Sequence, residues 1–106
     1  MIFIELTPFV GFRERHWTDE TFGGLQRFLL AAPDSGDLIP GGGGLRKIRW
    51  LVQGRGKRGG ARVIYYWHRS TDRIYFVYGY TKARRENLTA RQMRALQSLL
   101  GDLPHG

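Results

Sequence analysis

The chain has 106 residues, the size of one domain, and we expect residues 1–106 to form a single domain. Its 42% hydrophobic and 13% aromatic content is too high for a disordered basic tail. The absence of cysteine excludes disulfides, thiolate metal sites and a cysteine nucleophile. The opening segment, residues 1–5, lacks the features of a secretory signal, and no apolar run reaches the roughly 20 residues of a membrane span. We therefore expect a cytoplasmic protein.

The charge is distributed unevenly along the chain. The formal net charge is +8, yet residues 1–37 hold three basic and six acidic residues, whereas residues 38–106 hold fourteen basic and three acidic ones. No carboxylate occurs between Asp37 and Asp72. A positive surface without local acids attracts a polyanion, so nucleic acid is the leading partner. A membrane surface is disfavoured, because the basic stretch has the pattern of strands and turns and not of an amphipathic helix.

The first third of the chain predicts one strand and two helices. Residues 2–6 are β-branched and aromatic, typical of a short strand, and Pro8 begins a short helical segment over residues 8–15. Thr18 is the predicted N-cap of a longer helix. The apolar residues of this helix recur at helical spacing: Phe22, Leu25, Phe28 and Leu29. A turn over residues 33–36 ends it.

The remainder predicts extended segments and a last helix. Residues 38–39 are extended, the glycines at 41–44 form a bend, and strands follow over residues 45–52, 61–68 and 73–82. Short connections make these three strands an antiparallel meander. Thr89 and Gln92 form a capping box before a helix whose apolar residues are Met93, Leu96, Leu99 and Leu100. The pattern predicts an α+β fold: an antiparallel sheet of about four strands, covered by two N-terminal helices and one C-terminal helix.

Two familiar kinds of site are not supported. A phosphate-binding loop requires a glycine five residues before its Gly-Lys-Ser/Thr, but the chain has Leu51 there, and Arg58 follows Lys57. The histidines, at positions 16, 68 and 105, lack the spacing of metal ligands, and nothing indicates a Ser-His-Asp triad. An enzyme of this sequence would therefore depend on lysine and arginine.

One segment combines positive charge with aromatic rings. Eight basic residues lie between positions 46 and 69, interleaved with aromatic residues on two predicted strands. Arginine binds phosphate oxygens in bidentate fashion, and aromatic rings stack on unpaired bases. Strand alternation places Lys47 and Arg49 on one face and Arg46 on the other, together with Ile48 and Trp50. The alternative is a solvated basic face on an ordinary sheet, with most of the rings in the core.

The same segments resemble a known family. Residues 43–50, 56–66 and 74–82 are similar to the HigB-type branch of the RelE/ParE toxins, as are Asn87-Leu88-Thr89 and the Leu25-Gln26 pair followed by the turn at 33–36. The pattern Gly-Lys-x-Gly-Gly-x-Arg-Val-x-Tyr, at residues 56–65, is the most specific part. The resemblance extends over nearly the whole chain.

The resemblance implies a RelE-like fold and the toxin of a type II toxin–antitoxin pair, which cuts mRNA in the ribosomal A site without metal or other cofactor. The implied partners are mRNA and rRNA on the ribosome and a cognate antitoxin of the helix-turn-helix kind; the free toxin would be a monomer. The implied catalytic residues are Lys57, Arg62 and Lys82. The expected RNA-binding residues are Arg46, Lys47, Arg49, Arg55, Arg58, Tyr80, Arg84 and Arg85.

The sequence departs from the family pattern at two points. RelE relatives have an arginine directly after the strand-end lysine, where this chain has Ala83, and many have a tyrosine in the last segment, which this chain lacks. Three alternatives therefore stay open: a ParE-like gyrase inhibitor, a non-catalytic nucleic-acid-binding module, and a degenerate toxin. In the nuclease reading, a lysine whose pKa is lowered by neighbouring cations is the base, either Lys57 or Lys82, and Arg62 stabilises the phosphate.

Overall fold

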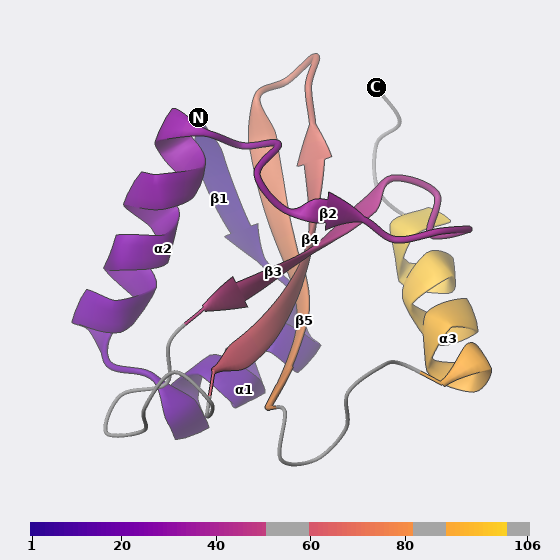
Figure 1. The fold of residues 1–106 in the computed structure, drawn as a ribbon, viewed down its shortest axis with the longest axis horizontal. Helices are drawn as coiled ribbons and strands as arrows, with labels where there is room; N and C mark the ends of the chain where they lie inside the picture. The colour runs from indigo at the N-terminus through magenta and orange to yellow at the C-terminus, as the bar shows by residue number, and fades with distance from the viewer. Residues whose placement is uncertain (51–59, 82–88, 102–106) are drawn as a thin grey trace.

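A five-stranded sheet with helices on both faces makes up the described part of the chain (Figure 1). The computed structural model describes residues 1–50, 60–81 and 89–101. In chain order the elements are β1 (Ile2–Glu5), α1 (Thr7–His16), α2 (Asp19–Ala31), β2 (Asp37–Leu38), β3 (Leu45–Trp50), β4 (Ala61–His68), β5 (Arg73–Thr81) and α3 (Ala90–Gly101). The α+β expectation is confirmed.

The sheet has the strand order β1-β5-β4-β3-β2. The predicted meander is confirmed, because β4 pairs antiparallel with both β3 and β5. Two details of the expectation were wrong. The sheet is mixed and not wholly antiparallel, because β1 lies parallel to β5. It also has a fifth strand, because the two residues of β2 pair antiparallel with Lys47 and Arg46 of β3.

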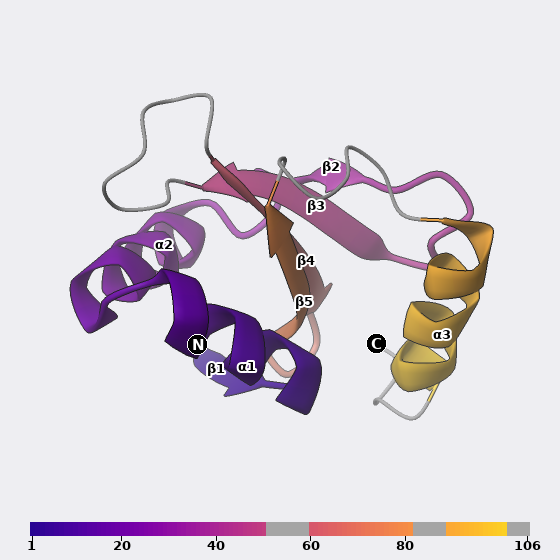
Figure 2. The same ribbon diagram turned by 90° about the horizontal axis from the view of Figure 1, so that it is seen from below.

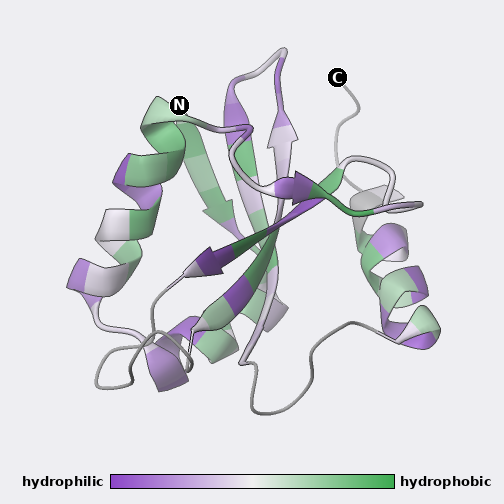
Figure 3. Ribbon diagram, in the orientation of Figure 1, coloured by the Kyte–Doolittle hydropathy of each residue, from purple (hydrophilic) through white to green (hydrophobic). Residues whose placement is uncertain are grey.

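Each face of the sheet is covered by its own helices, α1 and α2 on one side and α3 on the other (Figure 2). Beneath α1 and α2 the largest part of the core is aromatic: the rings of Phe9 and Phe76 stack with centroids 5.0 Å apart. On the opposite face, Leu96 of α3 packs in a cluster with Ile64 and Val77. Hydrophobic and hydrophilic residues alternate along α2 and α3, as expected of helices with one apolar face (Figure 3).

The predicted helix starts are also confirmed. The Thr21 amide donates to the Thr18 hydroxyl at the start of α2. At the start of α3, the Gln92 backbone amide donates to Thr89 Oγ1, and the Thr89 backbone amide donates to the side-chain Oε1 of Gln92. These two bonds form the predicted capping box. None of the described helices is long and apolar enough to cross a membrane.

Gly79 lets α1 approach the sheet closely. A Cβ atom at this position would lie 2.4 Å from Phe12 Cδ2, and Phe12 is buried. We expect Gly79→Ala to lower the free energy of unfolding by about 1–3 kcal/mol, because the added methyl group overpacks the core. Chemical denaturation measures this change. Gly11→Ala is the matched control on α1, since its Cβ would meet no atom within 4 Å apart from its chain neighbours and its own helix backbone, and it should be neutral or stabilising. Equal stability of the two variants would contradict the packing argument.

Candidate nucleic-acid interface

Three predicted site residues form a row across β3, β4 and β5, close to the ends of these strands. The β-sheet register pairs Arg49 of β3 with Arg62 of β4, and Arg62 with Tyr80 of β5. Cross-strand partners project from the same face, so the three side chains lie together, and Lys47 lies on that face two residues before Arg49. This is the α3 face of the sheet, because Tyr80 belongs to the cluster that packs against Leu96. We call Lys47, Arg49, Arg62 and Tyr80 the cationic row, after its three cations.

The cationic row is not neutralised within the part of the chain that the structure describes. Two arginines directly opposite each other on neighbouring strands repel each other and destabilise a sheet. The ion pairs present elsewhere join Met1 to Asp72 and Arg13 to Glu5 and Asp19; none involves the cationic row. The Arg62 guanidinium donates one hydrogen bond, of 3.3 Å, to the backbone oxygen of Gly60. The arrangement costs stability unless an external anion compensates it.

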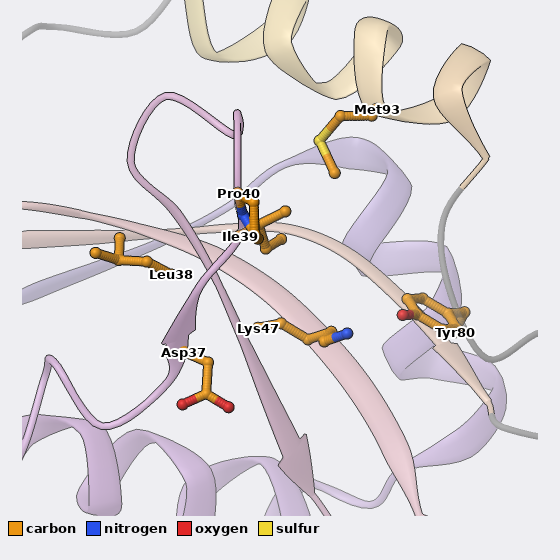
Figure 4. A pocket seen from close by; sticks show the side chains of 7 residues that line it. All are labelled: Asp37, Leu38, Ile39, Pro40, Lys47, Tyr80 and Met93. Carbon is orange, nitrogen blue, oxygen red and sulfur yellow. The ribbon is translucent and has the colours of Figure 1, made fainter.

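A pocket of about 350 Å³ lies beside the cationic row, between β2, β3, β5 and α3. Its lining residues are Asp37, Leu38, Ile39, Pro40, Lys47, Tyr80 and Met93. Figure 4 shows the Lys47 side chain extending toward the Tyr80 ring, with Met93 reaching down from α3. Asp37 is the cross-strand partner of Lys47, yet no ion pair joins them, and its carboxylate points away from the ammonium group (Figure 4). The pocket therefore combines one cation, one carboxylate, one aromatic ring and an apolar wall. The cation and the ring suit a nucleotide, with its phosphate at Lys47 and away from Asp37.

Arg46 is not part of this arrangement. It projects from the opposite face of β3, and its Nη1 donates to the backbone oxygens of Gly36 at 2.8 Å and Asp34 at 3.1 Å. These bonds satisfy two carbonyl groups in the turn between α2 and β2. The structure thus gives Arg46 a role in holding that turn and does not bring it together with Lys47 and Arg49.

Six of the expected site residues lie outside the described part of the chain. They are Arg55, Lys57, Arg58, Lys82, Arg84 and Arg85. The strand ends from which their segments leave are nevertheless adjacent, because Trp50 pairs with Ala61, and Ala61 pairs with Thr81. Arg62 is the next residue after this shared end, and Lys82 directly follows Thr81 in the sequence.

Sequence reasoning missed the contributions of Asp37 and Met93 to the pocket. Met93 was expected only as part of the apolar face of the last helix, and its position over the sheet depends on where that helix docks. Asp37 carried a signal, since it is the last acid before the long stretch without carboxylates. Among the histidines, His68 is buried with Nδ1 against the Thr71 hydroxyl, and the described residues contain no group of three potential metal ligands.

The fold and this site define a class of protein: an α+β domain with a row of cations, uncompensated among the described residues, on the α3 face of its sheet. Arg49 is exposed, Lys47 and Arg62 are half-buried, and the Tyr80 ring is buried. Residues 35–104 match the family model of the RelE toxin of the RelE/RelB toxin–antitoxin system. The chain belongs to this family. It is accordingly the toxin of a toxin–antitoxin system, and its cognate antitoxin is a partner.

Proposed function

We propose that this toxin is of the HigB type and is a ribosome-dependent endoribonuclease, which cuts mRNA in the A site and thereby stops translation in the cytoplasm. The observation that carries this proposal is the register of Arg49, Arg62 and Tyr80 across three strands, without a carboxylate partner for either arginine among the described residues. Such a row fits the phosphates and bases of a single RNA strand.

The chemistry follows from the substrate. RNA carries its own nucleophile: a base removes the proton of the 2′-hydroxyl, the 2′-oxygen attacks the adjacent phosphorus, and the bond from phosphorus to the 5′-oxygen breaks. The 5′-oxygen takes up a proton, which leaves a 2′,3′-cyclic phosphate and a 5′-hydroxyl. These steps require a base, an acid and stabilisation of the negative charge on the phosphate, and they require no metal or cofactor.

Arg62 is the described residue best placed to stabilise that charge. It projects from a central strand between Arg49 and Tyr80, so its backbone is fixed by pairing on both sides. A rigidly held guanidinium needs little reorganisation when charge develops on the phosphate oxygens. Lys47 and Arg49 would hold neighbouring phosphates, and a base in the pocket would contact the part of the otherwise buried Tyr80 that lines it.

The base is assigned to a lysine outside the described residues, Lys57 or Lys82. Neighbouring arginines disfavour the protonated form of either lysine, so we expect its pKa to lie below the ordinary value. Alignment of the 2′-hydroxyl with the scissile bond would come from the ribosome, which orders the mRNA and supplies the proximity contribution to the rate.

Cell-free translation with the purified chain tests the proposal. We expect mRNA cuts at fixed positions within codons, 5′-hydroxyl and cyclic phosphate ends, and no cuts when ribosomes are omitted. A helix-turn-helix antitoxin encoded beside the toxin should suppress the cutting. Double-strand DNA breaks in the presence of gyrase, with intact mRNA, would instead show a ParE-like inhibitor. Salt-dependent RNA binding without any cut would show a non-catalytic module or a degenerate toxin.

A further inference from the structure

A second hollow lies where α1 meets the end of β5. Its volume is about 130 Å³, and its lining residues are Pro8, Phe12, Arg15, His16, Tyr78, Gly79, Tyr80 and Thr81. The close contact of Phe12 with Gly79 brings the helix against the strand here. Strand β1 pairs with β5 only as far as Phe76, so the last residues of β5 have α1, and not a strand, as their neighbour on this side (Figure 1).

Tyr80 connects this hollow to the candidate site. Tyr80 lines the pocket beside Lys47 and also lines the hollow beside Arg15. The Tyr78 ring lies 6.1 Å from the Tyr80 ring, centroid to centroid, and lines the hollow as well. The two cavities therefore share one residue, Tyr80, and each has a basic residue in its lining.

The lining of the hollow suits an anion. Arg15 is exposed and makes no ion pair with any described residue, whereas Arg13, two positions earlier, is held by Glu5. The other polar residues of the lining are His16, Tyr78, Tyr80 and Thr81, and the described lining residues include no carboxylate. Guanidinium and hydroxyl groups are common donors to phosphate oxygens in complexes with nucleic acids.

We propose that this hollow binds a backbone phosphate of the substrate RNA, one step along the strand from the phosphate held at Arg62. The RNA would then pass the site of the buried Tyr80 ring, with phosphates bound by Lys47 and Arg62 on one side of it and by Arg15 on the other. This inference rests on the proposed function for the identity of the polyanion. It adds α1, which the sequence pattern gave no reason to place at the RNA, to the binding surface.

The test measures binding of a single-stranded RNA oligonucleotide, made uncleavable by 2′-O-methyl groups, as a function of salt concentration. Loss of one phosphate contact lowers the slope of log K against log salt by about 0.7 for a single strand. We expect this change for Arg15→Gln, together with about fivefold weaker binding at low salt. Arg27→Gln is the matched control, because Arg27 is exposed on α2, carries the same charge and lines neither cavity. Arg15→Lys should recover most of the slope.

Basic residues in a last helical turn also stabilise the helix, so thermal unfolding of each variant is followed in parallel. The inference would be overturned if Arg15→Gln changed the melting temperature but kept the wild-type salt slope. It would also be overturned if Arg15→Gln and Arg27→Gln had equal salt slopes. The two proposals fail separately. If the wild type cuts mRNA on the ribosome but Arg15→Gln binds RNA like Arg27→Gln, only the inference fails. If Arg15→Gln has the smaller salt slope but the wild type never cuts mRNA on the ribosome, only the nuclease proposal fails.

Discussion

Replacing Arg62 by alanine should reduce ribosome-dependent mRNA cleavage by roughly a hundredfold to a thousandfold, the effect of removing one preorganised donor from a developing anion. Arg62 lies centrally in the cationic row, and the strands on both sides fix its backbone. The measurement is the initial rate of appearance of cut mRNA in cell-free translation at saturating ribosome concentration.

The fold should tolerate this change, because the guanidinium makes a single long hydrogen bond, to the Gly60 carbonyl. Removal of a charge facing Arg49 also relieves repulsion, so we expect the melting temperature to stay constant or to rise. Arg69→Ala is the matched control: Arg69 is exposed in the turn after β4, at the far end of that strand, and stacks on Trp67. Undiminished cutting by folded Arg62→Ala would remove Arg62 from the mechanism. An equal loss of cleavage rate in Arg69→Ala would show that the rate depends on the total charge of the protein and not on the position of Arg62.

The fold was predictable from the sequence where its signals are local. Strand β4 was predicted with the bounds that the structure shows, because Ala61–His68 is a run of β-branched and aromatic residues between glycines and a turn. The caps at Thr18 and Thr89 are equally local, since each depends on a residue three positions away. The parallel pairing of β1 with β5 was not predictable in this way, because it depends on how the two helices after β1 pack and return the chain to the sheet.

The site was predictable in composition and only partly in geometry. Alternation along β3 already separated Arg46 from Lys47 and Arg49, and the structure confirms the separation. That Arg49 faces Arg62 depends on the register between two strands, which a chain segment rich in glycine does not specify. The pocket wall at Met93 and the hollow at Arg15 depend on the docking of whole helices, so no short stretch of sequence encodes them.

The Tyr65 hydroxyl fastens the turn between α2 and β2. It donates to the Pro33 carbonyl at 2.8 Å and accepts from the Gly36 amide at 2.9 Å. The Gly36 backbone oxygen also accepts a hydrogen bond from the Arg46 guanidinium. The ring is fully buried in the core beneath the helices. This turn leads directly into Asp37 and the pocket, so the hydroxyl links core packing to the shape of the candidate site.

Replacing Tyr65 by phenylalanine should lower the free energy of unfolding at neutral pH by about 2 kcal/mol, because a buried amide donor and a carbonyl lose their partner. Urea denaturation measures the difference. Tyr78→Phe is the control, since the Tyr78 hydroxyl makes no hydrogen bond to a described residue, and it should be nearly neutral. Wild-type stability of Tyr65→Phe would show that the two bonds contribute nothing.

The stability difference between wild type and Tyr65→Phe should also depend on pH in alkaline solution. Burial raises the pKa of the Tyr65 hydroxyl above its ordinary value of about 10, so the folded protein keeps this group neutral at a pH where the unfolded chain ionises it. The stabilisation is complete below the ordinary pKa and is lost as the pH rises toward and through the raised one. Phenylalanine does not ionise, so the stability gap between wild type and Tyr65→Phe should be constant from neutral pH to about 9.5 and should narrow above it. A gap that widened in alkaline solution would mean that the folded state favours the tyrosinate, contrary to the burial of the ring.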